Sequence, residues 1–180
     1  MGRTMRVATF VAILVALVAA EPAAGSELAQ ATGCPDSAAV AASAAAELAS
    51  MRCLVNGVRA SHGLPVLRAL PQLDRSSGLR AGAIRRCGDF SHTPCGQGFA
   101  QPFVRVGYLK RNGAVGENLA WGGSTLGSPG ATLAAWLRSP AHRENLLRPG
   151  WRDFGLALAR GNLFGNTGVS LWVLQFGRRN

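Results

Sequence analysis

The sequence predicts an α+β fold in which helices come first and a strand hairpin comes last. Two stretches, about 38–62 and 73–87, carry apolar residues at helical spacing. Further on, Phe154, Leu156 and Leu158 alternate with small residues, as in a strand. Residues 170–176 are apolar on both faces, which is typical of a buried central strand. The hairpin loop between these strands is expected at 162–168.

The helix boundaries follow from turn and capping residues. His62-Gly63 ends the first helix, so we expect His62 at the surface rather than as a ligand. A short third helix is expected at 132–138, and Ser139-Pro140 then begins another, with serine as the N-cap and proline in the first helical position. His142 therefore falls in a first turn, where the positive helix end favours the neutral imidazole. Residues 96–113 show no periodicity, and the glycine-rich 122–130 is expected to be a mobile connection.

The length of 180 residues and a hydrophobic content of 48% allow one domain with one good core. Arg3 and Arg6, the apolar stretch 7–20 and the small residues before Glu21 form a signal peptide. That stretch is shorter than the roughly 20 apolar residues that span a membrane. We therefore expect a secreted, extracellular chain with no membrane span in its mature part, divided into 1–20 (signal peptide), 21–49 (N-terminal lead and start of the first helix) and 50–178 (the domain).

All four cysteines lie in the exported part, where the oxidising environment favours two disulfides. Of the three possible pairings, proximity favours Cys34–Cys53 and Cys87–Cys95. The alternative is a metal site from Cys87, His92 and Cys95, which have finger-like spacing but lie outside a reducing cytosol.

The chain is strongly basic, with a formal net charge of +10. Its arginines are scattered in runs no longer than two and are not interleaved with aromatic residues, which argues against nucleic-acid binding. A generic basic surface of this kind favours an anionic envelope polymer or lipid as partner. We expect the protein to be a monomer.

Three short segments carry the candidate site chemistry: Phe90-Ser91-His92, Gly116-Glu117-Asn118 and the run from Ser139 to Asn145. Two of the three histidines in the chain lie in these segments, and Glu117 is 25 residues from each. Two imidazoles and one carboxylate from separate elements can converge on a metal ion or on a polarised water.

The sequence around these residues resembles the CAP superfamily (cysteine-rich secretory, antigen 5 and pathogenesis-related 1 proteins) in its bacterial SCP-domain form. The resemblance covers about residues 50–178 and rests on seven segments in the family's order: 54–59, 90–92, 107–108, 116–120, 136–139, 142–147 and 175–177. It implies a three-layer α-β-α sandwich with a cleft that holds histidines and glutamates.

In the family's full pattern, two histidines and two glutamates line the cleft. Matching residue by residue implies that His92, Glu117 and His142 are three of the four. The second glutamate follows the family tryptophan by three residues; here that tryptophan is Trp136, and position 139 is serine. Neither Glu144, rotated by about 200° from His142 on a helix, nor Asp89 is a convincing substitute.

Several interpretations stay open at this point. His92, Glu117 and His142 are the candidate ligands of zinc or another divalent metal, whose affinity should fall below about pH 6 as imidazoles protonate. The same three are weak catalytic candidates, because Glu117 cannot be both ligand and general base. They also fit a plain polar network. Ser139 is more plausible as a helix cap than as a nucleophile activated by His142.

The resemblance leaves three functions to weigh, and no cofactor is certain. The first is an extracellular binding module whose cleft takes a divalent metal and a lipid or cell-wall ligand. The second is a metal-assisted hydrolase acting on peptide or wall. The third is an envelope interaction protein with a vestigial cleft.

Overall fold

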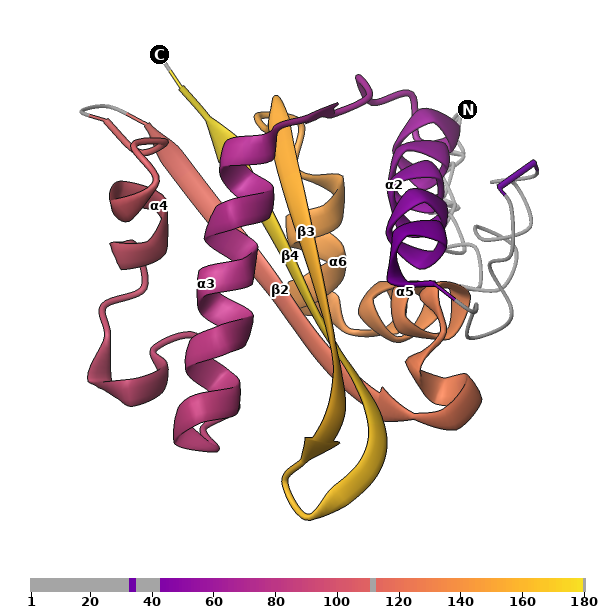
Figure 1. The fold of residues 1–180 in the computed structure, drawn as a ribbon. Helices are drawn as coiled ribbons and strands as arrows, with labels where there is room; N and C mark the ends of the chain where they lie inside the picture. The colour runs from indigo at the N-terminus through magenta and orange to yellow at the C-terminus, as the bar shows by residue number, and fades with distance from the viewer. Residues whose placement is uncertain (1–32, 35–42, 111–112, 180) are drawn as a thin grey trace, which may run out of the picture.

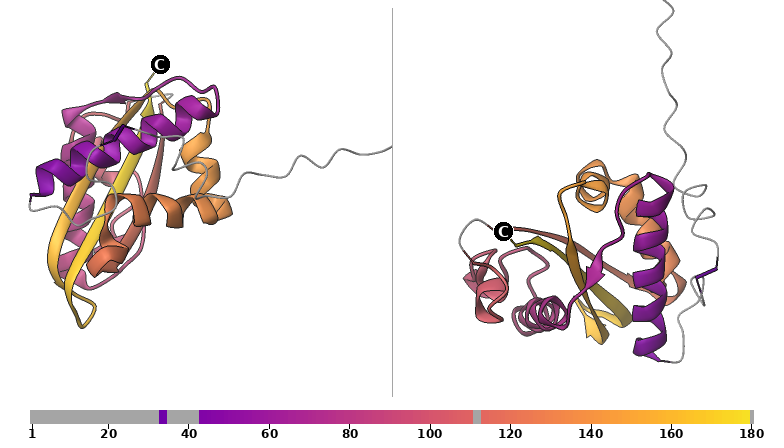
Figure 2. Two further views of the ribbon diagram at one scale, coloured as in Figure 1. Left: turned by 90° about the vertical axis from the view of Figure 1, so that its right-hand side faces the viewer. Right: turned by 90° about the horizontal axis from the view of Figure 1, so that it is seen from above.

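The computed structural model describes residues 33–34, 43–110 and 113–179, and it shows a sheet between two layers of helices (Figure 1). Its strands are β1 (Arg68–Ala69), β2 (Ala114–Gly123), β3 (Asp153–Leu163) and β4 (Asn166–Arg178). One helical layer contains α3 (Pro71–Cys87) and α4 (Gln101–Arg105), and the other contains α2 (Ala44–Ser61), α5 (Pro129–Arg138) and α6 (Pro140–Leu147) (Figure 2). This confirms the α+β class and the expected α-β-α sandwich.

The strand order is β1-β3-β4-β2, so β4 is internal and β2 lies at an edge. β4 is antiparallel to both β3 and β2, whereas β1 is parallel to β3. The central position of β4 confirms the prediction from its apolar run. Strands β3 and β4 are longer than expected, and only Phe164-Gly165 remains as the turn, with φ values of +52° and +76°.

Alternating residues of β4 supply two cores. Trp172, Leu174 and Phe176 pack into the larger core, beneath α2, α5 and α6. Val169, Leu171 and Val173 point the other way and pack with Ile84 of α3. Because both faces of β4 are covered, apolar residues occupy consecutive positions from Leu171 to Leu174 and do not alternate with polar ones.

The helices follow the predicted pattern with shifted starts. α2 begins after the N-cap Ser43 and ends at a C-cap formed by His62, which is only partly exposed. α5 begins at Pro129, earlier than expected, because Ser128 caps it by accepting a hydrogen bond from the amide of Ala131. The glycine-rich segment is not a free connection: it contains η2 (Ser124–Gly127) and is partly buried.

Both predicted disulfides are confirmed, Cys34–Cys53 and Cys87–Cys95. The second closes the loop between α3 and η1 (Pro94–Gly96). The alternative metal site is therefore wrong, because both of its thiols are consumed.

The predicted signal peptide lies outside the described residues, and within those residues no helix has the length and apolar character to cross a membrane.

Candidate functional site

Glu117 is the most constrained side chain of the site. It lies on β2 opposite Gln175 of β4, on the face of the sheet that α3 covers. Its Oε2 accepts hydrogen bonds from Arg80 Nε at 3.0 Å and from Gln175 Nε2 at 2.7 Å. Its Oε1 lies 2.8 Å from Nδ1 of His92. Both carboxylate oxygens are thus engaged, and the side chain has no exposed surface.

Arg80 neutralises this carboxylate from the middle of α3. The guanidinium is also fully buried, and its Nη2 donates to the carbonyl oxygen of Phe99 at 2.7 Å. A buried ion pair is tolerated when further hydrogen bonds satisfy both partners. Gln175 and the carbonyl oxygen of Phe99 supply part of those bonds here. Among the described residues, Arg80 Nη1 and Gln175 Oε1 are buried with no hydrogen-bond partner.

His92 lies on the loop that follows α3, and it is the exposed member of this group. Its side chain is about half exposed (49%) and packs edge-on against Phe99, with ring centroids 6.1 Å apart. An ionised carboxylate can only accept hydrogen bonds, so Nδ1 of His92 must carry the proton toward Glu117. In the neutral imidazole, Nε2 is then left with its lone pair.

His142 lies in the first turn of α6, as predicted, but Ser139 does not cap that helix with its side chain. Instead, Ser139 Oγ lies 2.9 Å from Nδ1 of His142. The pKa of His142 is lowered mainly by burial and secondarily by the charge of His92. The expected neutral state is therefore supported, although burial is the larger cause.

The residues flanking Glu117 explain the Gly-Glu-Asn segment. Asn118 points to the opposite face of β2, donates to the carbonyl oxygen of His142 and accepts from Asn145, both at 3.0 Å. A Cβ on Gly116 would lie 2.7 Å from Asn145 Oδ1 and from a ring carbon of Trp151. Glycine at position 116 thus lets Asn145 and Trp151 pack closely against β2. The next two residues, Glu117 and Asn118, form hydrogen bonds on opposite faces of this edge strand.

The structure brings the predicted residues together only in part. His92 contacts Glu117 directly, whereas the ring of His142 contacts Ser139, and the two halves are linked through Asn118. Asp89 accepts from Ser91, and Glu144 pairs with Arg148. Neither replaces the second family glutamate.

The expected three-ligand metal set does not fit these contacts. Glu117 is committed to Arg80, Gln175 and His92, so it offers no free oxygen to a cation. Among the residues that the structure describes, no three His, Cys, Asp or Glu side chains form a group that could hold a metal ion. The ring nitrogens not used in these contacts are the Nε2 atoms of His92 and His142.

Arg80 and Gln175 were missed by the sequence reasoning. Arg80 shares the buried side of α3 with Leu73, Ser77 and Ile84. A charged residue on the buried side of a helix requires a buried partner, so the position of Arg80 in the sequence already indicated an internal ion pair. Gln175 interrupts the apolar run of β4, which is an equally readable signal.

Comparisons with known proteins identify the family of this chain and others with its fold. The model of the cysteine-rich secretory protein family, CAP, matches residues 53–176. No curated protein sequence matches significantly.

Three bacterial structures share the fold. An extracellular protein containing an SCP domain from Bacillus anthracis has a TM-score of 0.62 and 22% identity over 74% of this chain, which spans only 40% of that protein. An outer surface protein from Borrelia burgdorferi has a TM-score of 0.59 and 21% identity, over 72% of this chain and 90% of its own. A cysteine-rich secretory protein from Staphylococcus aureus has a TM-score of 0.53 and 16% identity, over 74% of this chain and 39% of its own. Such identities establish the fold alone, whereas the match to the family model covers more than half of the sequence. The chain therefore belongs to the cysteine-rich secretory protein (CAP) family.

Proposed function

We propose that this protein is an extracellular binding module whose site is formed by His92 and His142 at the edge strand β2. The observation that carries the proposal is the burial of Glu117, with both oxygens engaged by Arg80, Gln175 and His92. A carboxylate held in this way serves as an anchor and is not available as a general base, which must reach the proton it abstracts.

Each residue then has a defined task. Glu117 orients His92 by accepting a hydrogen bond from its Nδ1–H, so Nε2 is the atom offered to a ligand. His142 is held by Ser139, and its lowered pKa keeps it neutral near pH 7. Nε2 of His92 and the neutral imidazole of His142 can form hydrogen bonds with hydroxyl or amide groups, such as those of a cell-wall or lipid ligand.

The same two imidazoles are the groups that would hold a divalent metal. Because the three-ligand set does not form, solvent would have to complete the coordination, and zinc should bind weakly. The surplus of arginine favours an anionic envelope polymer as the surface on which the module acts. The bacterial neighbours described as extracellular or outer-surface proteins support a secreted location, as do the two disulfides.

Co-sedimentation with insoluble envelope polymer tests binding and hydrolysis in the same tube. We expect the protein to pellet with the polymer and to release no soluble fragments. The double variant His92→Ala/His142→Ala should bind more weakly, whereas the control His62→Ala, at the end of α2, should bind normally. Fragment release that is lost in Glu117→Gln would contradict the proposal.

One contact favours a second candidate, a serine hydrolase. Ser139 Oγ lies 2.9 Å from Nδ1 of His142, the pairing that activates a serine nucleophile. A fluorophosphonate probe separates the two functions. Labelling of Ser139 that disappears in His142→Asn would establish the hydrolase, and absence of labelling in the folded protein would leave the contact as a structural one.

A further inference from the structure

We propose that a pocket between α3 and α4, separate from the histidine site, binds a phosphate group. The pocket has a volume of about 290 Å³ and is lined by Leu79, Arg86, Gln97, Gln101, Pro102 and Arg105. This volume is at the lower limit of small-molecule pockets, which start near 300 Å³. It suits a single phosphate group with a small organic remainder.

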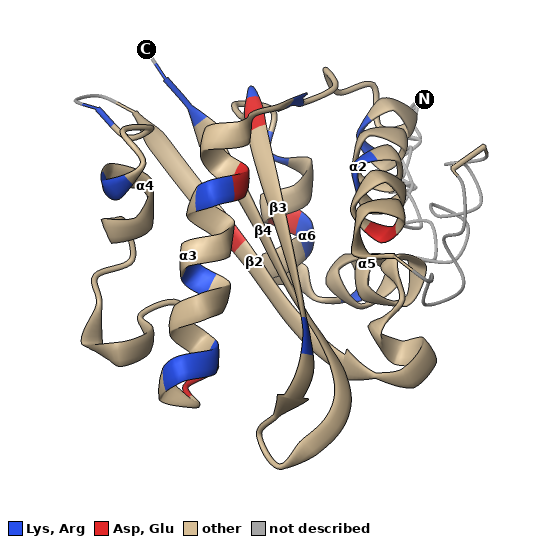
Figure 3. Ribbon diagram, in the orientation of Figure 1, with Lys and Arg blue, Asp and Glu red and all other residues tan. Residues whose placement is uncertain are grey.

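The charge of this pocket is not balanced by the protein. Arg86 and Arg105 both line it, and guanidinium groups only donate hydrogen bonds. Within the described residues, neither arginine forms an ion pair or hydrogen bond. The six carboxylates described there have other partners: Glu47 with Arg160, Asp74 with Arg52, Asp89 with Ser91, Glu117 with Arg80, Glu144 with Arg148, and Asp153 with Arg68. Figure 3 shows the resulting excess of basic positions on α3 and α4.

The remaining lining residues complete a phosphate site. Gln97 and Gln101 supply neutral amide donors, and Leu79 and Pro102 offer apolar contact to the organic part of a ligand. Two arginine forks match the oxygens of a phosphate, and two positive charges match its charge of about −1.5 to −2 at neutral pH. A carboxylate would neutralise only one of the two guanidiniums.

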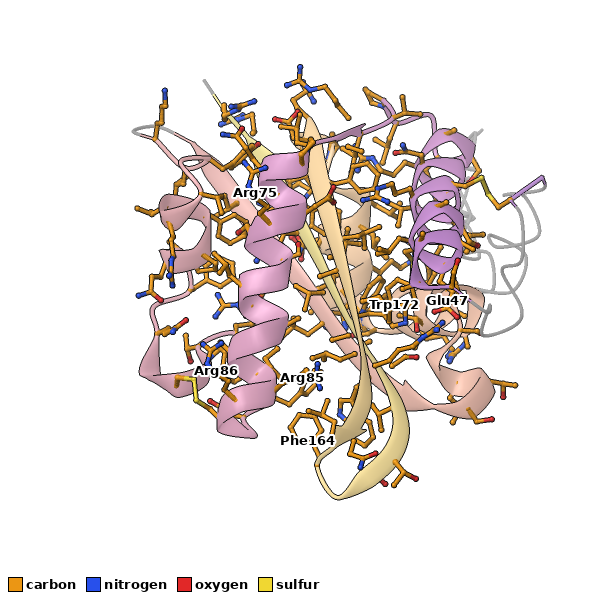
Figure 4. The ribbon with its side chains drawn as sticks, in the orientation of Figure 1. Glu47, Arg75, Arg85, Arg86, Phe164 and Trp172 are labelled. Carbon is orange, nitrogen blue, oxygen red and sulfur yellow. A yellow bond between two sulfur atoms is a disulfide. The ribbon has the colours of Figure 1, made fainter. Side chains whose placement is uncertain are left out.

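The walls of the pocket are held in place before any ligand arrives. The Cys87–Cys95 disulfide joins the end of α3, next to Arg86, to η1. Gln97 follows η1 directly, and its amide donates to the carbonyl oxygen of Pro94 at 3.2 Å. Figure 4 shows Arg86 on the side of α3 toward the α4 segment, whereas Arg85 points toward the β3–β4 hairpin. A pre-formed site of this kind avoids much of the ordering cost of binding.

Isothermal titration calorimetry with inorganic phosphate, at constant ionic strength, tests the pocket on the mature protein. We expect saturable binding and at least about a tenfold higher Kd in Arg86→Gln and in Arg105→Gln, since each removes charge-assisted hydrogen bonds. Arg75→Gln is the matched control, because Arg75 is an exposed arginine on the same helix outside the pocket (Figure 4). It should change Kd less than about twofold, as expected for screened surface charge.

Chemical-shift mapping on the unmodified protein provides an independent readout. Phosphate should shift the amides of residues 97–105 and the second half of α3. Glycerol 3-phosphate and vesicles containing phosphatidic acid then distinguish a soluble phosphate ester from a lipid headgroup, and binding of either supports the pocket. The proposal is overturned if phosphate does not bind saturably, if the shifts map elsewhere, or if Arg75→Gln weakens binding as much as the pocket variants.

Discussion

Replacing Arg80 by methionine removes the charge that compensates Glu117 while keeping a long, flexible side chain. Both partners are fully buried, with Nε and Oε2 3.0 Å apart. After the replacement, the carboxylate keeps only Gln175 and His92 as donors. Breaking a buried ion pair from one side typically costs 3–5 kcal/mol, against a total stability of about 5–15 kcal/mol for a domain. We therefore expect Arg80→Met to lower the free energy of unfolding by about 3–5 kcal/mol.

Urea unfolding followed by circular dichroism measures this change and allows a double-mutant cycle. Glu117→Gln removes the charge from the other side, and the double variant removes both charges. If the pair is mutually stabilising, the double variant should lose at least about 1 kcal/mol less than the sum of the single variants. Arg75→Met, exposed on the same helix, should stay within about 0.5 kcal/mol of the unmodified protein. A loss below about 1 kcal/mol in Arg80→Met, or additive single losses, would refute the reasoning.

Two further predictions follow from the contacts of Gly177 and His142. A Cβ on Gly177 would lie 2.2 Å from the hydroxyl of Tyr108, so Gly177→Ala should lower the free energy of unfolding by about 1–3 kcal/mol through overpacking. Gly150 has open space around it, so Gly150→Ala should be nearly neutral. Urea unfolding compares the two variants, and equal effects would contradict the steric reason. Because the pKa of His142 is lowered in the folded state, the unfolded chain binds more protons below about pH 6.5, and stability should fall as the pH drops through that value. His142→Asn should show a shallower loss between about pH 6.5 and 5, and an unchanged slope would contradict the assignment.

The parts of the fold that the sequence predicted correctly are those with strong local periodicity. The helices α2 and α3 carry apolar residues at helical spacing on the face that becomes buried, and the central strand β4 carries apolar residues on both faces. The short α4 was not expected, because its five residues are too few to show a helical period. It is held instead by burial of Phe103 beside Leu73 and Tyr108, a tertiary effect.

The candidate site likewise contains residues that could be predicted from local sequence and residues that could not. The short segments around His92, Glu117 and His142 were recognisable because each is contiguous in the chain. The partners of Glu117 were not, because Arg80 is 37 residues away and Gln175 is 58 residues away, and only the packing of α3 and the register of β2 against β4 bring them together. Ser139 was predicted to cap the helix with its side chain from its position alone, but its hydroxyl instead contacts Nδ1 of His142, three residues later.

The tautomer of His92 tests most directly whether Glu117 is an anchor that orients a ligand-binding histidine. Long-range nitrogen–proton correlation NMR of the imidazole ring, at a pH where the ring is neutral, identifies the protonated nitrogen. Because Nδ1 lies 2.8 Å from a carboxylate oxygen, we expect His92 to be protonated at Nδ1 with a bare Nε2, and we expect this preference to disappear in Glu117→Ala. A proton on Nε2 in the unmodified protein, or a tautomer that does not change in Glu117→Ala, would contradict the anchoring role.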